Sequence, residues 1–492
     1  MMEAVIFGAG QVCAEILPDV EKQFRVLYIV DNNKKFWGTK FKSYDVKSPD
    51  EAAGRGCKII IASTRYVFEI AGQLKRMGMA EDDILMCSGF YVGERCTYDI
   101  HPVNEKLIQI KDTQLIKFDT LKNEEITCRN TKVLIGVSFF STFAVQLIKN
   151  LSKRYQNIEF SLLTSDEKYY ENTLLFKLGH LYIYKSYTDL KTILTLLPSY
   201  DVIHFLWIEA EWSFYANLAR RKAKRLVLTV GGSDFYRASE PEKEYKRKLI
   251  LCADYINLEN STTRKEFIEY YGREVSKKTK LVPYGMELLD DIDEMEIVSD
   301  NIKRKELNIP PHKIIVTCGY NAHSAHQHLQ LVEALGNISD DVKEKIVCVF
   351  PMTYPVGKDV YIQSVSEALN KKRLDHVIFT DFMSDKLIAQ YATLSDIMIH
   401  VQTTDALSSA MREEMYGGAV VIAGKWLPYD ILYEKGIYFL NVETVEDVPE
   451  ILEDVVKNLG FYKSKCRNNR CLIRNEYSWD TVAKGWYGLW ED

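Results

Sequence analysis

Short apolar runs alternate with amphipathic stretches along almost the whole chain. Val5–Phe7 and Lys58–Ala62 have the composition of buried strands, and Tyr66–Met77 has the spacing of a helix. The alternation starts again at Val133–Val137 and a third time at Ile314–Cys318. Strands that alternate with helices along a chain pack into parallel sheets. The pattern therefore predicts an α/β protein made of three successive units.

The breaks between these units predict the domain boundaries. Ligands of doubly wound sheets bind at the carboxyl ends of the strands, so we expect the main site in a cleft between the second and third units. The acidic stretch Leu288–Asp300 is expected to be flexible, and the last helix, Trp479–Trp490, is unusually aromatic. The predicted parts are a Rossmann-like domain, a linker, a first lobe, a second lobe and a C-terminal crossover helix, at residues 1–100, 101–130, 131–295, 296–470 and 471–492.

Composition and charge narrow the class of protein. The 492 residues are 47% apolar and 27% charged, and a net charge of −6 gives no case for a nucleic-acid partner. The ten cysteines form no CxxC pair and lie in apolar segments, which is typical of reduced cysteines in the cytosol. The sequence has neither a transmembrane-length apolar run nor a signal peptide. We therefore expect a cytoplasmic protein with at most peripheral membrane contact.

The most informative segment is Thr403–Gly424, in which Asp405 lies eight positions before Glu413 on a new helix. A helix start offers unpaired N–H groups and a partial positive charge, which both suit a diphosphate. Asp405 is then placed to accept hydrogen bonds from sugar hydroxyls, and Glu413 to bind a ribose diol. Ser408 and Ser409 would supply amides to the diphosphate. The alternative is an amphipathic helix with two surface acids before a buried strand.

Residues 131–492 resemble the GT-B glycosyltransferases, whose fold has two facing Rossmann-like lobes, here with an extra N-terminal Rossmann-like domain. Glu413, Met415 and Gly418 before the run VVIAG resemble the donor helix of retaining family 4. This implies that Glu413 binds a nucleotide-sugar donor and that Asp405 acts in catalysis. That family has Glu where this chain has Asp405, so retention or inversion stays open. The other landmarks, in the expected order, are Gly231–Asp234, Val282–Met286, Thr380–Ser384, Ser395–Ile397 and Asn475–Trp486.

A second similarity is to the bacterial 4-acetamido-4,6-dideoxygalactosyltransferases of family 56. It rests on Gly319-Tyr320-Asn321 leading to His328, on Phe350–Pro355, and on Lys425-Trp426 after the final strand. This similarity implies a dTDP- or UDP-activated deoxy-amino sugar as donor and a glycan or lipid-linked acceptor. The first lobe would then bind the acceptor and the second lobe the donor.

Several polar residues have two interpretations. Asp234 is predicted to take a proton from an acceptor hydroxyl, with a helix-capping aspartate as the alternative. Asn321 and His323 are predicted to face phosphate. Lys425 would also meet phosphate, unless it is a solvated surface lysine. The histidines at 323, 326 and 328 would suit a transition metal, but no Asp, Glu or Cys accompanies them and GT-B enzymes generally work without metal. No metal is predicted.

The run Arg220–Arg225 holds five basic residues in six positions. It is either the solvated end of a helix or a patch that meets anionic lipid headgroups, where each basic residue adds about 1 kcal/mol. A lipid-linked acceptor favours the second interpretation and a place at the inner face of the membrane. Nucleic acid is disfavoured because no aromatic platform accompanies these charges.

The N-terminal unit carries Gly8-x-Gly10-x-x-Cys13, with Asp31 closing the second strand. This is a dinucleotide fingerprint whose third glycine is replaced. The segment Asp31–Phe41 resembles small Rossmann-like domains attached to bacterial sugar-processing enzymes. Gly8, Gly10 and Asp31 are therefore candidates to bind NAD or another nucleotide. The alternative is a degenerate domain used for docking or regulation.

The resemblance as a whole implies a metal-independent, hexosyl-type glycosyltransferase of bacterial surface-polysaccharide synthesis that needs no cofactor for transfer. Two rivals are a GT-B nucleotide-sugar epimerase or hydrolase, which needs no acceptor, and a non-catalytic scaffold, which would tolerate loss of Glu413. A third is that the N-terminal domain has its own NAD-linked sugar chemistry, against which Cys13 argues. Glu414 lies about 100° around the helix from Glu413 and is expected to face solvent.

Overall fold

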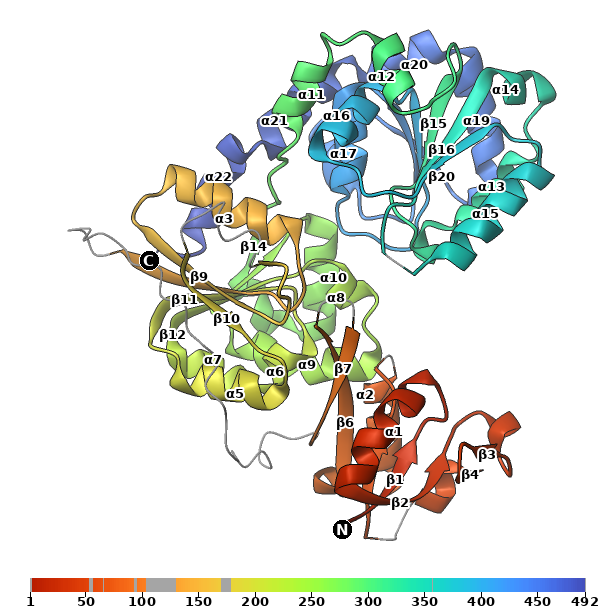
Figure 1. Ribbon diagram of the computed structural model, residues 1–492. Coiled ribbons are helices and arrows are strands. Elements are labelled where there is room, and N and C mark those ends of the chain that lie inside the picture. Colours follow the sequence, from red (N-terminus) through yellow and green to blue (C-terminus); the bar gives the residue numbers. More distant parts are fainter. Residues whose placement is uncertain are drawn as a thin grey trace. The chain divides into compact units, whose positions relative to one another are not determined.

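The computed structural model describes residues 2–52, 56–64, 66–92, 95–102, 130–169, 178–355 and 357–491. The chain forms two compact units (Figure 1). The predicted linker lies almost wholly outside the described residues, and the predicted domain boundaries stay predictions. The first unit comprises Met1–Val230, Ala238–Asn257 and Arg273–Lys278, and the second comprises Gly231–Arg237, Leu258–Gly272 and Thr279–Asp492.

The first sheet has the order β3-β4-β2-β1-β5-β6-β7 and is parallel except for the pairs β3–β4 and β6–β7. Successive residues of β1 face opposite sides, so Val5 packs with the α2 residue Ile70 and Ile6 with the α1 residue Cys13. The elements are β1 (Met2–Phe7), α1 (Gln11–Gln23), β2 (Phe24–Val30), β3 (Lys40–Phe41), β4 (Tyr44–Lys47), β5 (Lys58–Ile61), α2 (Val67–Arg76), β6 (Ile84–Val92) and β7 (Arg95–Pro102).

The second sheet has the order β10-β9-β8-β11-β12-β13-β14, and its strands from β10 to β13 run parallel. The last strand, β14, is counted with the second compact unit. The strands are β8 (Thr131–Gly136), β9 (Ile158–Thr164), β10 (Leu178–Ile183), β11 (Tyr200–Leu206), β12 (Ala223–Thr229), β13 (Tyr255–Leu258) and β14 (Thr279–Leu281). The helices are α3 (Thr142–Arg154), α5 (Tyr187–Leu196), α6 (Ala210–Phe214), α7 (Ala216–Lys222), α8 (Ser233–Tyr236), α9 (Glu240–Cys252) and α10 (Ser261–Tyr271).

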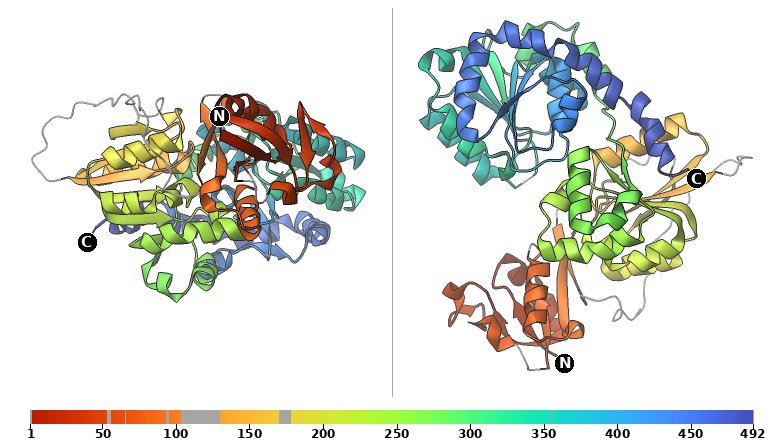
Figure 2. Two further views of the ribbon diagram at one scale, coloured as in Figure 1. Left: turned by 90° about the horizontal axis from the view of Figure 1, so that it is seen from below. Right: turned by 180° about the vertical axis from the view of Figure 1, so that it is seen from behind.

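The third sheet has the order β17-β16-β15-β18-β19-β20 and is parallel throughout. Helices lie on both of its faces (Figures 1 and 2). Its strands are therefore apolar on both sides, as expected for a buried parallel sheet. The strands are β15 (Ile314–Cys318), β16 (Ile346–Pro351), β17 (His376–Phe379), β18 (Ile397–His400), β19 (Val420–Gly424) and β20 (Leu440–Val442).

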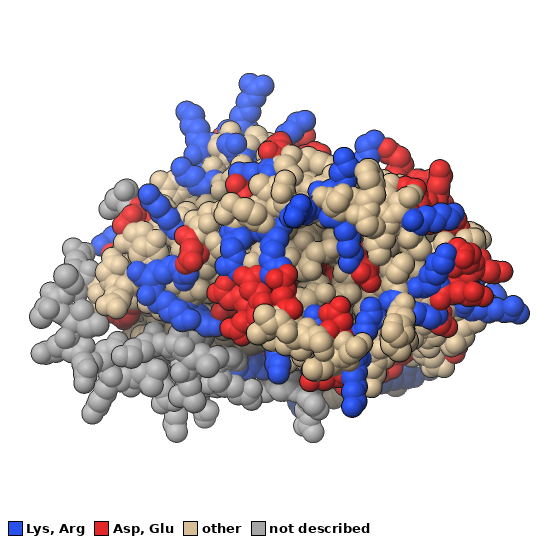
Figure 3. Space-filling model, turned by 90° about the horizontal axis from the view of Figure 1, so that it is seen from above, with Lys and Arg blue, Asp and Glu red and all other residues tan. Residues whose placement is uncertain are grey.

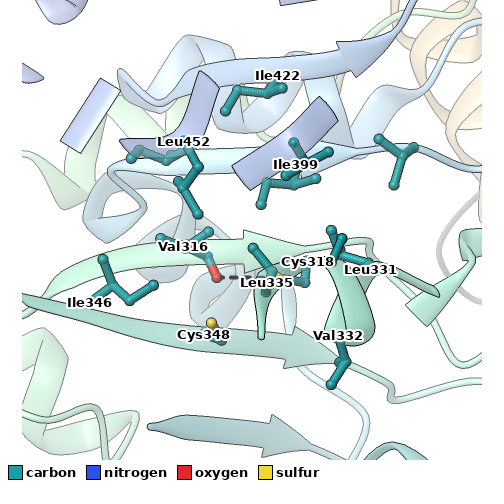
Figure 4. Packing of buried hydrophobic residues seen from close by; sticks show 14 of the residues in the cluster. Val316, Cys318, Leu331, Val332, Leu335, Ile346, Cys348, Ile399, Ile422 and Leu452 are labelled. Carbon is teal, nitrogen blue, oxygen red and sulfur yellow. Dashed lines mark hydrogen bonds between the residues drawn. The ribbon is translucent and has the colours of Figure 1, made fainter. Parts of the chain in front are cut away.

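One core of the second unit lies between this sheet and the helices on one of its faces, α13 and α19 among them (Figure 4). Val316 of β15 and Ile399 of β18 are fully buried, and they pack with Leu331 of α13 and Leu452 of α19. The helices of the unit are α11 (Leu289–Met295), α12 (Asp300–Glu306), α13 (His328–Leu335), α14 (Asp340–Lys345), α15 (Asp359–Lys371), α16 (Asp385–Leu394), α17 (Ser409–Gly417), α18 (Asp430–Glu434), α19 (Val448–Lys457), α20 (Leu459–Lys465), α21 (Asn469–Tyr477) and α22 (Trp479–Gly488).

The acidic stretch Leu288–Asp300 is not flexible, and the expectation for it was wrong. Residues Leu289–Met295 form α11, which buries Leu289 and Ile292. Its acids have basic partners from far along the chain, because Arg474 donates to Asp290 at 2.9 Å and to Asp293 at 2.6 Å. These ion pairs join α11 to α21, the helix that carries Arg474.

The closing helix α22 packs against the chain that follows β14. The indole Nε1 of Trp486 donates to the carbonyl of Pro283 at 2.9 Å, and Met286 N donates to Tyr477 O at 2.8 Å. Gly285 is needed here, because a Cβ at this position would lie 2.4 Å from the ring of Trp479. The aromatic residues at the end of the sequence therefore form a packing surface.

Acidic and basic side chains are interspersed on the face of the molecule that Figure 3 shows. This distribution fits the small net charge of −6. Of the described helices, none is long and apolar enough to cross a membrane.

We expect Gly417→Ala to lower the free energy of unfolding of the second unit by about 1–3 kcal/mol, the usual cost of overpacking. Gly417 ends α17, and a Cβ there would lie 2.2 Å from the carbonyl oxygen of Ala392. Gly460 in α20 is the matched control, since nothing lies within 4 Å of its Cβ position. Gly460→Ala should leave stability unchanged or raise it by up to about 1 kcal/mol. Denaturant unfolding measures both, and a Gly417→Ala variant as stable as the wild type would contradict the packing described.

Candidate functional site

The candidate site lies where the order of the third sheet reverses. The chain runs outward from β15 to β16 and β17 on one side, and from β18 to β19 and β20 on the other. The loops that leave the carboxyl ends of β15 and β18 therefore lead away from each other. Open α/β sheets bind their ligands at such a point. Two hydrogen bonds join these loops: Thr403 N donates to Ala325 O at 2.8 Å, and Gln327 Nε2 donates to Val401 O at 2.6 Å. The predicted residues Asn321, His323 and Asp405 all lie on them.

The loop after β18 leads directly into α17. Ser408 is the N-cap, and its Oγ accepts from Met411 N at 3.1 Å. The hydroxyl of Ser409 accepts from the buried guanidinium of Arg412 at 3.2 Å. Both predicted serines therefore use their hydroxyls to build the helix start, while the amides of the first turn have no carbonyl partner within the helix.

Asp405 is held by groups from three segments. Its Oδ1 accepts from Ala406 N at 2.9 Å, and its Oδ2 accepts from the hydroxyl of Tyr429 and lies 3.4 Å from His400 Nε2. Burial acts to raise the pKa of Asp405, but the hydrogen bond and charge of His400, with Tyr429 and Ala406, lower it below the usual value. The side chain is 16% exposed. Asp405 is therefore a fixed carboxylate with access to the site.

Glu413 and its neighbour Glu414 lie side by side on α17 but in different surroundings. Glu413 is half-buried, and burial raises its pKa to about 7, opposed by Arg412 and reinforced by Asp385. Glu414 does not face solvent: it is only 6% exposed, and the expectation for it was wrong. Burial raises the pKa of Glu414 to about 8, against a hydrogen bond from Ser395. The hydroxyl of Ser395 therefore provides a polar contact for an acid that the helical pattern had placed towards solvent.

Three side chains near the site were not predicted. Asn260, which caps α10 after β13, donates to the carbonyl of Ala406 at 2.8 Å. Glu259 precedes it, and burial raises its pKa to about 7, with Arg412 lowering it and Asp405 raising it. Arg237 is exposed and its charge acts on Tyr320, His323 and His326. The signal in the sequence that could have revealed Asn260 is its place just after the apolar strand β13.

The turn that contains Asp234 lies against the loop that carries Asp405. Gly232 has φ +89°, and a Cβ there would lie 2.7 Å from the Cβ of Ala406. Asp234 follows on α8 and is buried. The turn therefore approaches the backbone beside Asp405 as closely as a glycine allows.

The loop after β15 places Asn321 and His323 side by side. Asn321 Oδ1 accepts from His323 N at 2.8 Å, and His323 Nδ1 accepts from Ala325 N at 3.1 Å. Since Nδ1 accepts, the ring proton of neutral His323 sits on Nε2. Burial, Arg237 and Lys358 lower the pKa of His323. Tyr354 is coupled to Asn321 by a hydrogen bond and to Glu413 and Asp405 by charge.

His326 and His328 lie beneath this loop as neutral, buried rings. Burial is the main cause that lowers the pKa of both, to about 4 for His328. Gly319 has φ +70°, and a Cβ there would lie 2.9 Å from His328 Nε2. Within the described ranges, no group of three or more His, Cys, Asp or Glu side chains could hold a metal ion.

Lys425 is not brought to the site. Its ammonium pairs with Glu443, and its side chain is 61% exposed. The neighbouring Trp426 does turn inward, since its Nε1 donates to Gln402 O at 2.8 Å.

The basic run of the first unit is largely engaged with its own surroundings. Arg220 lies 3.5 Å from Asp254, Lys222 donates to Leu197 O at 2.6 Å, and Lys224 pairs with Asp201 at 2.6 Å. Arg221 is exposed. The run is thus mainly the paired end of a helix.

In the N-terminal fingerprint, Gly8 has φ +113° and Gly10 caps α1. Asp31 accepts from Ala9 N at 2.7 Å through one oxygen and from Asn33 N at 2.7 Å through the other. Asp31, the acid that would bind a ribose, therefore already uses both carboxylate oxygens to accept from backbone amides, one of them in the turn between Gly8 and Gly10.

Comparisons with known proteins find one matching family model and several solved structures with a similar fold. Residues 1–85 match the family described as "C2185-like, N-terminal". No curated protein sequence matches the chain. Similar solved structures include a glycosyltransferase from Rickettsia africae, with TM-score 0.60 and 16% identity over 74% of this chain and 98% of that one. HepE from Anabaena, in complex with UDP and glucose, has TM-score 0.59 and 14% identity over 73% and 99%.

Sucrose-phosphate synthase from Thermosynechococcus elongatus has TM-score 0.58 and 13% identity over 73% of this chain and 98% of that one. These proteins are GT-B glycosyltransferases. The chain has the GT-B fold. The predicted fold class is therefore confirmed, while family 4 and family 56 stay resemblances.

We expect Glu414→Gln to stabilise the second unit by an amount that grows with pH. The folded pKa of Glu414, about 8, lies above its usual value of 4.5, so its stabilising contribution is complete below about pH 4.5 and is lost as pH rises towards 8. Each unit of pKa difference corresponds to about 1.4 kcal/mol. Glutamine cannot ionise and escapes this loss.

Thermal unfolding at pH values between about 5 and 8 measures the effect. Glu344→Gln is the control, because Glu344 is exposed and its replacement should change the melting temperature equally at every pH. A gain for Glu414→Gln that is constant or falls with pH would show that Glu414 is ionised in the folded protein.

Proposed function

We propose that the protein is a glycosyltransferase that moves a sugar from a nucleotide-diphosphate donor to a glycan or lipid-linked acceptor. The observation that supports this most is the convergence at the β15–β18 switch point of Asp405, the capped start of α17 and Glu413, on a chain with the GT-B fold. The Anabaena HepE structure, which shares this fold, contains UDP and glucose.

The donor diphosphate would meet the first-turn amides of α17, the Nε2–H of His323 and the guanidinium of Arg237. These groups offset the negative charge that develops on the leaving group, and they are already in place. Glu413 would accept hydrogen bonds from the ribose diol, and Asp405 from a sugar hydroxyl. Catalysis then comes mainly from positioning and from stabilising the departing diphosphate, without a metal.

The finer assignments belong to this proposal. The donor would be a dTDP- or UDP-activated hexose, on the second similarity a deoxy-amino sugar, used in bacterial surface-polysaccharide synthesis. Asp234, which follows the turn beside Ala406, would take the proton of the acceptor hydroxyl. The protein would work in the cytoplasm, and the exposed Arg221 would contribute to contact with the inner face of the membrane. NAD or a nucleotide at Gly8, Gly10 and Asp31 is a separate proposal.

We expect a nucleoside diphosphate to raise the melting temperature of the wild type in a thermal-shift screen of UDP, dTDP, GDP, CMP and NAD(H). A ligand at 100 times its dissociation constant adds about 2.7 kcal/mol of stability. Glu413→Ala should abolish the shift, because it removes the acceptor of the ribose diol. Glu434→Ala, an exposed acid on α18, should keep it.

If NAD(H) alone stabilises the wild type, the transferase proposal fails and the N-terminal site gains support. If Glu413→Ala keeps the full shift for UDP or dTDP, the donor site has been placed wrongly. If a sugar nucleotide is consumed without any acceptor, an epimerase or hydrolase is the better description.

We expect Arg237→Ala to weaken UDP binding about tenfold, since a charge-assisted contact to phosphate is lost. Calorimetry at fixed ionic strength measures this, with Arg221→Ala as the matched control that removes an exposed arginine elsewhere. Equal affinities for the two variants would exclude Arg237 from the diphosphate site.

A further inference from the structure

Asp405, the acid proposed to bind the donor sugar, ends a chain of hydrogen bonds that runs through Tyr429 and His400. The proposed transfer reaction does not itself require this chain. His400 ends β18 and is fully buried, and Tyr429 follows β19 and is 2% exposed. The hydroxyl of Tyr429 donates to Asp405 Oδ2, and His400 Nε2 lies 2.7 Å from the same hydroxyl. His400 is the last residue of β18, Asp405 lies in the loop that follows β18, and Tyr429 lies in the loop that follows β19, all at the carboxyl edge of the third sheet.

The number of available protons determines which group donates each hydrogen bond in this chain. Tyr429 has a single hydroxyl proton, and the carboxylate of Asp405 takes it. The hydroxyl oxygen must therefore accept from His400, which fixes the ring proton of His400 on Nε2. The imidazole also packs against the rings of Tyr320 and Tyr429, at 5.8 and 5.7 Å between centroids. This packing holds the ring in one orientation.

We propose that Tyr429 and His400 are positioning residues for the donor sugar, acting through Asp405, and this rests on the proposed function above. Tyr429 binds one oxygen of the carboxylate and Ala406 N binds the other, so the carboxylate plane is fixed. His400 fixes the hydroxyl of Tyr429 in turn. The remaining lone pairs of Asp405 then meet the sugar hydroxyl without a conformational search.

This arrangement also keeps the buried carboxyl ionised. Burial by itself raises the pKa of Asp405, and the bonds from His400 and Tyr429 reverse that effect. Without them, the carboxyl would be protonated closer to neutral pH and would lose part of its acceptor capacity. Besides burial, the negative charge of Asp405 raises the pKa of titratable groups around it, namely Glu259, Tyr236, Tyr320 and Tyr354.

The test compares sugar nucleotides with the bare nucleotides, because only the former present hydroxyls to Asp405. Calorimetry would measure UDP, dTDP, UDP-glucose, UDP-N-acetylglucosamine and dTDP-glucose on the full chain. For the tightest sugar nucleotide, we expect Tyr429→Phe to weaken binding about tenfold, while the affinity for its bare nucleotide stays within about twofold. His400→Leu should do the same, whereas His400→Gln, which keeps an N–H donor, should recover part of the affinity.

Tyr416→Phe is the matched control. Tyr416 is also a buried tyrosine that donates to an aspartate, Asp293, at 2.8 Å, but it faces α11 and α21. Its loss should leave both affinities unchanged. The Tyr429→Phe effect should also grow as the pH falls, because the variant lacks a hydrogen bond that favours the ionised carboxyl of Asp405, whereas the wild type should change less. The double variant of Tyr429→Phe and His400→Leu should lose no more than either alone.

Two outcomes overturn the inference while leaving the transferase proposal intact. One is that bare and sugar nucleotides lose affinity together, which is what a merely structural role predicts. The other is that Tyr429→Phe binds UDP and its sugars as the wild type does. A wild type that binds none of the five nucleotides overturns the proposed function and this inference with it.

Discussion

The adjacency of β15 and β18 is the constraint on which the candidate site depends. Both strands are buried on both faces and fixed in register, Val316 beside Ile397 and Cys318 beside Ile399. A shift of one residue would turn every side chain of a strand to the opposite face, so the register is strongly determined. The loops that leave these strands consequently start from fixed points, and the hydrogen bonds between them, at Thr403 and Gln327, need little further ordering.

Buried charge is the cost of this arrangement. Asp405, Glu413, Glu414 and Arg412 lie within one helical turn or the loop before it, and each is at least half-buried. A buried charge is destabilising unless it is paired or hydrogen-bonded. Arg412 is compensated only in part: it is fully buried, donates to Leu407 O and Ser408 O at 3.3 and 3.2 Å, and lies over the ring of Tyr477 at 4.4 Å. Its Nη1 has no hydrogen-bond partner among the described residues. Because these buried charges are already held in place, the site can bind a charged ligand with little reorganisation.

The local pattern of the sequence predicted the apolar strands and a helix that carries Glu413. These features depend on residues within about one or two turns of each other. Features that depend on distant partners were not predictable from a single sequence. The burial of Glu414 depends on Ser395, and α11 depends on Arg474, more than 170 residues further on. Asn260 reaches Ala406 across 146 positions of sequence, and no periodicity signals such a contact.

The shorter acid at position 405 has a physical explanation in these contacts. An aspartate is short enough for Oδ1 to accept from the amide of the next residue, Ala406 N, at 2.9 Å, while Oδ2 turns towards Tyr429. A glutamate would move its carboxylate by about one methylene and would lose the bond to Ala406 or to Tyr429. The position of this acid is therefore set by hydrogen bonds from the loops after β18 and β19, which the short side chain of aspartate can accept together. Substituting Asp405 by Glu would lengthen the acid but remove the restraint that makes its position useful.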